Sequence, residues 1–279
     1  MIEIPAQGAA YFASDLHLSG HTPKTLEAFE HWLASVAQAH TLVFLLGDVF
    51  EVWYGDDHQD EVSHRVANAT QAASRSGARV FFMHGNRDFL LGDVYAEYGE
   101  FELLPDPEFI KTQAGVVLLT HGDQFCTDDK AYQQFRAQSR QEAWQAGFLA
   151  KPLKERQAIA QAIRTESKQH KSNSAMAIMD VNRHTVEQTY AGHWPDGYYV
   201  GKCQTIVHGH THRCAVHNTF ECPAPASPSS VQGSLSQGVR IVLPDWDYDT
   251  PNTDETKNRH KGGFLKLKHT GEYQLTVFN

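Results

Sequence analysis

Five apolar segments of this chain each end in residues that can bind a metal ion. The segments are short, and the polar residues follow them directly along the chain. These residues are Asp15-Leu16-His17, Gly47-Asp48, Gly85-Asn86, His121-Gly122-Asp123 and Gly209-His210-Thr211-His212. In open α/β sheets, ligands bind beyond the carboxyl ends of the strands. If the five segments are strands of such sheets, their polar residues converge on one rim, so the pattern constrains both the fold and the site.

Strand-like and helix-like segments alternate through the first half of the chain. Amphipathic helices are predicted over 23–39 and 58–76. Strands are predicted over 9–14, 41–46, 79–83, 116–120, 205–207, 239–243 and 264–267. Strands that alternate with helices are typical of an α/β sandwich with substantial parallel pairing. The sequence therefore predicts the α/β class.

The residue types in the five motifs favour a site for two divalent transition-metal ions. Imidazole and carboxylate ligands together suit Mn, Fe, Co or Zn, whereas oxygen ligands alone suit Mg or Ca. Residues i and i+2 lie on the same side of an extended segment, so Asp15 and His17 can face one ion. The same holds for His210 and His212. The single carboxylate of Asp48 is able to bridge two ions.

Each motif taken alone has an ordinary structural explanation. A Gly-Asp pair after a strand is most often a turn, and Asn86 alone can be a turn residue. His121 alone can be a hydrogen-bonded histidine of the core, and His-x-His pairs occur on solvated strands. The combination of all five motifs, in order and each after an apolar run, favours the metal site.

Composition restricts the classes of partner and compartment. The formal net charge of −9 argues against a nucleic-acid binder, whose footprint is a basic stripe. None of the four cysteines forms a Cys-x-x-Cys pair, and such sparse usage suits a reducing cytosol. The first residues lack the features of a signal peptide, and no apolar run approaches the ~20 residues that span a bilayer. We therefore expect a soluble protein or one attached to a membrane only at its surface.

The middle of the chain differs from its two ends. Residues from about 128 to 190 contain helix formers and few strand signals, and they predict three inserted helices. Apolar residues alternate there with basic ones, namely Phe135, Trp144, Phe148, Leu149 and Leu153 with Arg136, Arg140, Lys151, Lys154 and Arg156. Such a pattern would suit acyl chains at an anionic membrane surface, or an ordinary helix core with a solvated face. Two polar stretches, 218–238 and 248–263, are predicted to be exposed loops.

The five motifs, in this order, resemble those of the calcineurin-like metallophosphoesterases. Two longer stretches are more specific, because they resemble segments of the UDP-2,3-diacylglucosamine pyrophosphatase (hydrolase) family of lipid A biosynthesis. They are Phe50-Glu51-Val52-Trp53-Tyr54-Gly55-Asp56-Asp57 and Ile178-Met179-Asp180-Val181-Asn182. The resemblance implies two packed mixed sheets flanked by helices. Residues 1–127 and 191–279 would form this core, and residues 128–190 an inserted helical lid.

The resemblance also implies a role for each candidate residue. One metal ion would be bound by Asp15, His17, Asp48 and His212, and the other by Asp48, Asn86, His121 and His210. The expected metal is Mn²⁺. The substrate would be contacted by Asn86, Arg87, Asp129, Ser167 and His210, with Arg87 and His210 acting in catalysis. Lys171 and Ser174 occupy two lid positions where the family usually has Asn and Lys, and they are expected to contact the substrate there.

The implied reaction is hydrolysis of the pyrophosphate bond of UDP-2,3-diacylglucosamine to UMP and 2,3-diacylglucosamine 1-phosphate (lipid X). A water activated by the two metal ions would attack the nucleotide-side phosphorus. Because Arg87 directly follows Asn86, its guanidinium is expected to bind a phosphate oxygen. An Arg cannot protonate a leaving group near neutral pH. The leaving group should then be intrinsically good, as a phosphate is in pyrophosphate cleavage.

The expected partners are a lipid-linked UDP-sugar and the surface of the cytoplasmic membrane, without nucleic acid. We expect a cytoplasmic monomer that associates peripherally with the inner membrane. The departures at Lys171 and Ser174 leave another nucleotide diphosphate or a phosphodiester open as the substrate. A non-catalytic metal-binding or scaffolding module is a third hypothesis, which hydrolysis that disappears in a folded Asp48→Asn variant would exclude.

Overall fold

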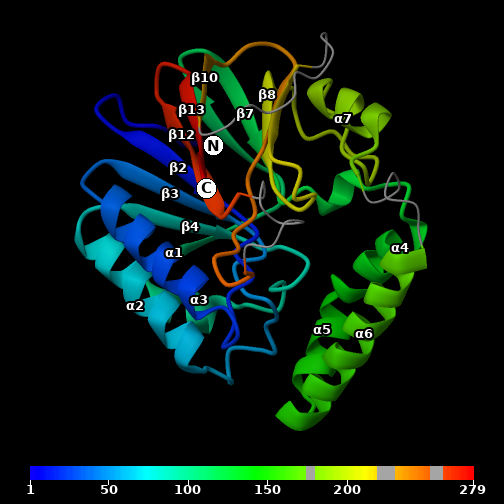
Figure 1. Ribbon diagram of the computed structural model, residues 1–279. Helices are drawn as coiled ribbons and strands as arrows, with labels where there is room; N and C mark the ends of the chain where they lie inside the picture. Colours follow the sequence, from blue (N-terminus) through cyan, green and yellow to red (C-terminus); the bar gives the residue numbers. More distant parts are fainter. Residues whose placement is uncertain (174–179, 219–229, 252–259) are drawn as a thin grey trace.

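Two mixed β-sheets packed face to face form the centre of the protein, with helices on their outer faces (Figure 1). The computed structural model describes residues 1–173, 180–218, 230–251 and 260–279. Among these residues, one sheet has seven strands in the order β10 (Ser230–Ser234), β13 (Glu272–Phe278), β12 (Gly262–Lys268), β2 (Ala9–Ala13), β3 (Thr41–Leu46), β4 (Arg79–Met83) and β5 (Glu102–Leu104). The other has six, in the order β1 (Ile2–Glu3), β6 (Glu108–Thr112), β7 (Gly115–Leu119), β8 (Thr205–His208), β11 (Val239–Val242) and β9 (Ala215–Asn218). The predicted α/β sandwich of two mixed sheets is confirmed.

Aromatic side chains fill the space between the two sheets. Phe44 lies between Phe12 and Phe81 in a stack, with ring centroids 4.9 and 4.8 Å apart. All three rings are fully buried in one cluster with residues of the six-stranded sheet. Burying a Phe side chain contributes about 1.5–3 kcal/mol. Because β2, β3 and β4 pair in parallel around this stack, their carboxyl ends lie at the same edge.

Three helices cover the outer face of the seven-stranded sheet: α1 (Pro23–Val36), α2 (Glu61–Arg75) and α3 (Asp93–Gly99) (Figure 1). Pro23 lies in the first turn of α1, where its missing N–H leaves no hydrogen bond unmade. Asp60 caps α2 by accepting a hydrogen bond from Ser63 N. The apolar faces of the helices bury Phe29 and Val66 against the strands.

The segment predicted to be an insertion contains four helices among its described residues, not three. α4 (Lys130–Ser139), α5 (Glu142–Leu149) and α6 (Leu153–Asn173) form a group beside the sandwich (Figure 1). The fourth, α7 (Arg183–Tyr190), starts at its own cap, Asn182, and packs on the outer face of the six-stranded sheet through Val186 and Tyr190. The sequence prediction merged α7 with the others. The boundaries of the lid at 128 and 190 stay a prediction.

Arginines of the inserted helices contact the core of the protein. Arg136 Nε lies 2.9 Å from Asp123 Oδ2, and Arg140 donates to the Gly85 carbonyl at 2.8 Å. Arg156 donates to Asp57 Oδ1 at 2.7 Å. The sequence interpretation left these three side chains either to acyl chains at an anionic membrane surface or to a solvated helix face. In the structure, their charges hold the helices against the sandwich, and the membrane role stays a prediction.

Part of one predicted loop is a strand. Residues 230–234 lie within the stretch 218–238, and they form β10 at the edge of the seven-stranded sheet. The loop prediction is wrong there because β10 pairs antiparallel with β13, with Val231 opposite Leu275. Much of the two predicted loops, 219–229 and 252–259, lies outside the described residues.

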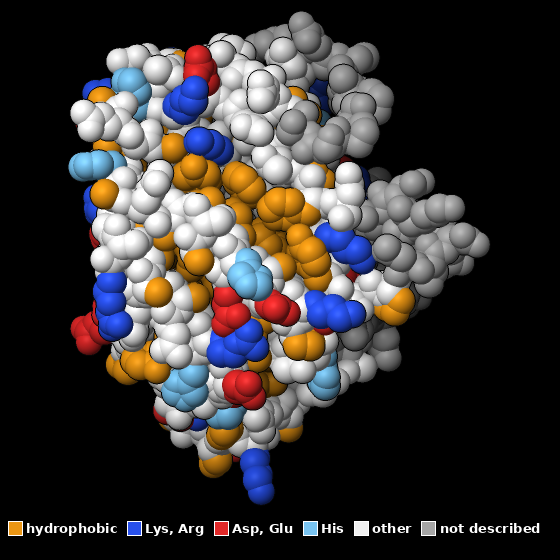
Figure 2. Space-filling view, turned by 60° about the vertical axis from the view of Figure 1, so that its left-hand side comes forward, with side chains coloured by type: hydrophobic (Ala, Val, Ile, Leu, Met, Phe, Trp, Pro, Cys, Tyr) orange, Lys and Arg blue, Asp and Glu red, His pale blue; other side chains and the backbone are white. Residues whose placement is uncertain are grey.

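Two features of the described surface bear on possible partners. No helix in the described part of the chain has the length and apolarity that crossing a membrane requires. Figure 2 shows one face on which hydrophobic side chains gather centrally, with acidic, basic and histidine side chains interspersed below them. The expected absence of a nucleic-acid partner stays a prediction. Among the described residues, Cys126, Cys203 and Cys214 form no disulfide with one another, and Cys222 lies outside them.

Candidate metal centre

The carboxyl ends of five strands bring the predicted ligand residues together. They are Asp15 after β2, Asp48 after β3, Asn86 after β4, His121 after β7 and His210 after β8. Parallel pairing within each sheet aligns these ends, and the two sheets meet at this edge. The resulting cavity has a volume of about 650 Å³, and its lining includes His17, Asp48, Asn86, Arg87, His210 and His212.

The first group of potential ligands contains Asp15, His17 and His212. One ligand atom from each lies within 4.8 Å of the others. His17 Nε2 and His212 Nε2 are 3.3 Å apart, and His212 Nε2 is 3.4 Å from Asp15 Oδ1. The two residues of the Asp-x-His motif and His212 of the distant His-x-His motif thus lie close together, as the sequence predicted.

The second group surrounds His121. Its Nε2 lies 3.2 Å from Asn86 Oδ1 and 3.7 Å from Asp48 Oδ1, and its ring centroid is 5.1 Å from that of His210. Asp15 belongs to this group as well, because its carboxylate also lies within 4.8 Å of Asp48 and His121. By distance, Asp15 is the carboxylate common to both groups, whereas the sequence predicted Asp48. The bridging role of Asp48 stays a prediction.

An acceptor oxygen lies behind each of three histidine rings. His17 Nδ1 is 3.1 Å from Glu51 Oε2, and His212 Nδ1 is 3.4 Å from Asp245 Oδ2. His121 Nδ1 is 2.9 Å from the carbonyl oxygen of Leu46. Carboxylates and carbonyls only accept, so in each neutral imidazole the proton is assigned to Nδ1. Each Nε2 is then a free lone pair directed into the site, an arrangement common around protein metal ions.

The first group fits a divalent cation. With Nδ1 protonated, His17 and His212 bring two Nε2 lone pairs to within 3.3 Å of each other, next to the carboxylate of Asp15. Asp15 Oδ1 is buried and has no hydrogen-bond partner among the described residues. When both imidazoles are neutral, these three acceptors face one another without a donor and repel, and a cation removes this repulsion. Mixed nitrogen and oxygen ligands suit Mn²⁺, Fe²⁺, Co²⁺ or Zn²⁺.

Charges within the site shift the pKa values of its histidines. Burial alone would lower the pKa of His212, but the carboxylates of Asp15 and Asp245, each 3.4 Å away, raise it to about 10. Burial likewise opposes protonation of His121, and the charges of Asp48 and Asp15 raise its pKa to about 9. Because ligands bind metals in the deprotonated form, an ion entering this site must displace these protons.

The backbone at the ligands is in an unusual conformation. Five of the seven predicted ligands have positive φ angles between 49° and 66°, namely Asp15, His17, Asp48, His210 and His212. For a residue other than Gly, the left-handed region costs about 1–2 kcal/mol. Such residues concentrate at functional sites, where the surrounding structure holds them in place. Nothing in the sequence signals this conformation.

Three acidic residues near the site were not assigned a role from the sequence. Glu51 and Asp245 lie behind His17 and His212. Asp88 is fully buried, and it accepts hydrogen bonds from Gly85 N and Val49 N, both at 2.8 Å. The sequence signal that could have identified these residues is their position in the chain. Asp88 and Glu51 follow ligand motifs by two and three residues, and Asp245 follows β11.

The predicted substrate contacts fall into two sets. Arg87 lines the cavity, and its backbone N–H donates to Asp48 Oδ1 at 2.8 Å. Asp129 does not line the cavity but caps α4, because its carboxylate accepts from Tyr132 N. Ser167 is exposed on α6, the side chain of Lys171 is not described, and Ser174 lies outside the described residues. Substrate roles for these four residues stay predictions.

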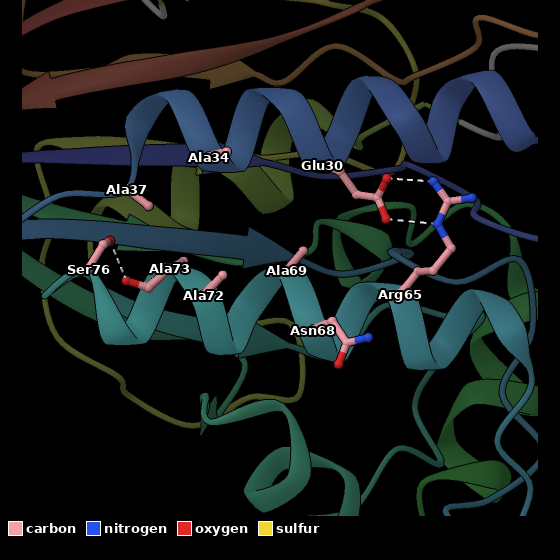
Figure 3. Close-up of a pocket in the computed structure, with 9 residues that line it drawn as sticks. All are labelled: Glu30, Ala34, Ala37, Arg65, Asn68, Ala69, Ala72, Ala73 and Ser76. Carbon is pink, nitrogen blue, oxygen red and sulfur yellow. Dashed lines mark hydrogen bonds and ion pairs between the residues drawn. The ribbon is translucent and has the colours of Figure 1, made fainter.

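A second groove lies between α1 and α2 (Figure 3). It has a volume of about 400 Å³, and most of its lining residues are alanines. The Glu30 carboxylate accepts from Arg65 Nε at 2.8 Å at one end of the groove (Figure 3). None of the predicted ligands lines this groove. The chemistry-bearing residues therefore belong to the cavity at the strand ends.

Comparisons with known proteins agree with this geometry. The family model of the calcineurin-like phosphoesterases matches residues 10–214. A protein of Aromatoleum aromaticum named UDP-2,3-diacylglucosamine hydrolase is 40% identical over 243 residues, covering 87% of this chain and 91% of the relative. Proteins of the same name from Bordetella pertussis (39% over 273 residues; 97% and 96% covered) and Xanthomonas oryzae (40% over 242 residues; 84% and 90% covered) are similar. The chain belongs to the calcineurin-like phosphoesterases, a family of metal-dependent hydrolases.

Proposed function

We propose that the protein hydrolyses the pyrophosphate bond of UDP-2,3-diacylglucosamine, producing UMP and 2,3-diacylglucosamine 1-phosphate for lipid A biosynthesis. The names of relatives that match most of the chain support this substrate. The observation that carries the reaction type is the convergence of Asp15 Oδ1, His17 Nε2 and His212 Nε2 in a cavity that Arg87 also lines.

Two divalent ions, proposed to be Mn²⁺, would be held by the seven ligands Asp15, His17, Asp48, Asn86, His121, His210 and His212. When bound, such ions lower the pKa of a water and neutralise charge on the attacked phosphate. Burial and the neighbouring His121 lower the pKa of His210 to about 4, so this imidazole is neutral at pH 7 and available as a ligand.

Arg87 is proposed to bind the pyrophosphate. Its backbone is held on both sides, since its N–H donates to Asp48 Oδ1 and its carbonyl accepts from Trp53 N at 3.1 Å. Arg87 Nε is buried without a hydrogen-bond partner among the described residues, so a donor is available for a phosphate oxygen. Because a guanidinium keeps its protons, Arg87 stabilises charge, and the lipid phosphate leaves without protonation.

The inserted helices are proposed to accept the acyl chains. Trp144 and Phe148 stack with ring centroids 5.3 Å apart, and Phe89 of the core lies 6.1 Å from Trp144. These rings offer an apolar wall between the insert and the sandwich. We also propose that the protein acts as a monomer on the cytoplasmic surface of the inner membrane, as expected for a lipid-linked substrate.

The proposal is tested by product analysis in ¹⁸O-labelled water. The metal-free protein is reloaded with Mn²⁺ and incubated with UDP-2,3-diacylglucosamine in detergent. The expected products are UMP that carries the label and an unlabelled sugar phosphate, because water attacks the nucleotide-side phosphorus. Label in the lipid would refute that site of attack, and absence of UMP would refute the substrate. UDP-N-acetylglucosamine and a phosphodiester, assayed in parallel, test the alternative substrates.

Arg87→Ala is expected to lower kcat/KM by about 10²–10³-fold, the usual effect of removing one donor that stabilises transition-state charge. Arg87→Lys should recover only part of this loss, since an ammonium cannot bind two oxygens in a fork. Metal content, measured by mass spectrometry, should stay near that of the unmodified protein, because the Arg87 side chain is not a ligand. A variant that loses its metal would contradict the proposed role.

A further inference from the structure

Glu51 contacts a predicted metal ligand with one oxygen and the inserted helix α6 with the other. Its Oε2 lies 3.1 Å from His17 Nδ1. Its Oε1 accepts a hydrogen bond from Arg164, which lies on α6. Glu51 and Arg164 both line the cavity that contains the metal ligands. A single carboxylate therefore links the insert to the candidate metal centre.

The backbone holds Glu51 and His17 in a fixed relation. Glu51 N donates to the carbonyl of Leu18 at 3.0 Å, and Phe50 forms a parallel bridge with Leu18. His17 N in turn donates to the carbonyl of Asp48 at 3.0 Å. With both backbones fixed, the orientation of the His17 ring depends on where the Glu51 carboxylate lies. Arg164 restricts that carboxylate from the opposite side.

A second arginine of α6 also binds the core, but it does not contact a residue that lies next to a predicted ligand. Arg156, eight residues before Arg164 on α6, donates to Asp57 Oδ1 at 2.7 Å and to the carbonyl of Tyr54 at 2.6 Å. Neither Tyr54 nor Asp57 belongs to the groups of potential ligands or lines the cavity. Both arginines hold α6 to the core, but only Arg164 binds a residue that touches a ligand.

We propose that Glu51 is a positioning residue that couples the docking of α6 to metal binding by Asp15, His17 and His212. When α6 is docked, Arg164 holds the carboxylate 3.1 Å from His17 Nδ1, and His17 Nε2 is directed at the ion. Coupling between two binding events is reciprocal, so the ion also stabilises the docked helix. The inference rests on the metal site of the proposed function, but not on the identity of the substrate.

The test uses the full chain with Mn²⁺ alone as the probe, and it needs no substrate. Glu51→Gln and Arg164→Gln are compared with Arg156→Gln, the matched control. Calorimetry on the metal-free proteins gives Mn²⁺ affinity, and amide hydrogen exchange with and without Mn²⁺ gives the stability of α6 over 153–167. Loss of a group that orients a ligand typically weakens metal binding about 10–100-fold. We expect such a loss for one Mn²⁺ in Glu51→Gln and a smaller one in Arg164→Gln.

The hydrogen-exchange measurements distinguish coupling between Mn²⁺ binding and α6 from the simple loss of a contact that holds α6 to the core. Exchange in α6 should become faster in both arginine variants, because each loses an anchor. Mn²⁺ should slow this exchange in the unmodified protein and in Arg156→Gln, but not in Arg164→Gln or Glu51→Gln. Equal Mn²⁺ affinity and equal slowing in the two arginine variants would overturn the proposal. If Glu51→Gln does not fold, Arg164→Gln decides, because it keeps Glu51. Failure to release UMP would refute the proposed substrate and leave these measurements unaffected.

Discussion

Asp48→Asn is expected to lower kcat/KM by at least about 10³-fold without unfolding the protein. The side chain lies next to both groups of ligands, with Oδ1 3.7 Å from His121 Nε2 and within 4.8 Å of an Asp15 oxygen. The change removes one negative charge and replaces an acceptor by an amide N–H₂ that repels cations. Metal-ion stabilisation of a transition state amounts to several kcal/mol, and about 1.36 kcal/mol corresponds to tenfold in rate.

The Asp48→Asn change is expected to affect catalysis but not the stability of the fold. Asp48 and Asp88 are both buried, and burial together with the charge of Asp48 raises the pKa of Asp88 to about 6. Removing the Asp48 charge relieves this repulsion but also removes the attraction to His121, so the metal-free variant should melt close to the temperature of the unmodified protein. Wild-type hydrolysis in a variant that still binds two ions would contradict the proposed role of Asp48.

A matched control removes a carboxylate away from the site. Glu30 pairs with Arg65 in the groove between α1 and α2, where no predicted ligand lies (Figure 3). Glu30→Gln makes the same change from carboxylate to amide. Surface ion pairs of this kind contribute about 0–1 kcal/mol, so both stability and hydrolysis should change little.

The strands that carry the site could be predicted from the sequence because each is a buried apolar run with a polar end. The predicted bounds of β3 and β4, 41–46 and 79–83, agree with the structure. β1, β5, β6, β9, β10 and β13 were not predicted, since each is short or partly exposed and lacks a buried apolar run. β10, for example, forms only because β13 lies beside it.

The convergence of the candidate ligand residues could likewise be predicted, whereas the residues behind them could not. Motif order places His17 and His212 among the ligands, but which carboxylate stands behind each ring depends on loops with left-handed residues. Glu51 is a single acidic residue in a loop until the structure brings its two oxygens to His17 and Arg164. Asp129 shows the opposite case, where a residue implied as a substrate contact also caps a helix.

Asp88→Ala is expected to lower the free energy of unfolding by about 4 kcal/mol and to weaken metal binding. The buried carboxylate accepts from four backbone N–H groups, those of Asp48, Val49, Phe50 and Gly85, at 2.8–3.3 Å. Each buried donor left without a partner costs about 1 kcal/mol or more. These donors belong to the loops after β3 and β4, so the positions of Asp48 and Asn86 should loosen together.

Asp56→Ala distinguishes loss of stability from loss of the site. Asp56 has a comparable structural role, because its carboxylate accepts from Gly92 N, Tyr95 N and Trp53 Nε1, all at 2.9 Å. None of these donors belongs to a predicted ligand, so denaturant unfolding should show a stability loss of about 3 kcal/mol with Mn²⁺ binding retained. Asp88→Ala should lose both. Equal Mn²⁺ affinity in the two variants would mean that the hydrogen bonds of Asp88 stabilise the fold without positioning the ligands.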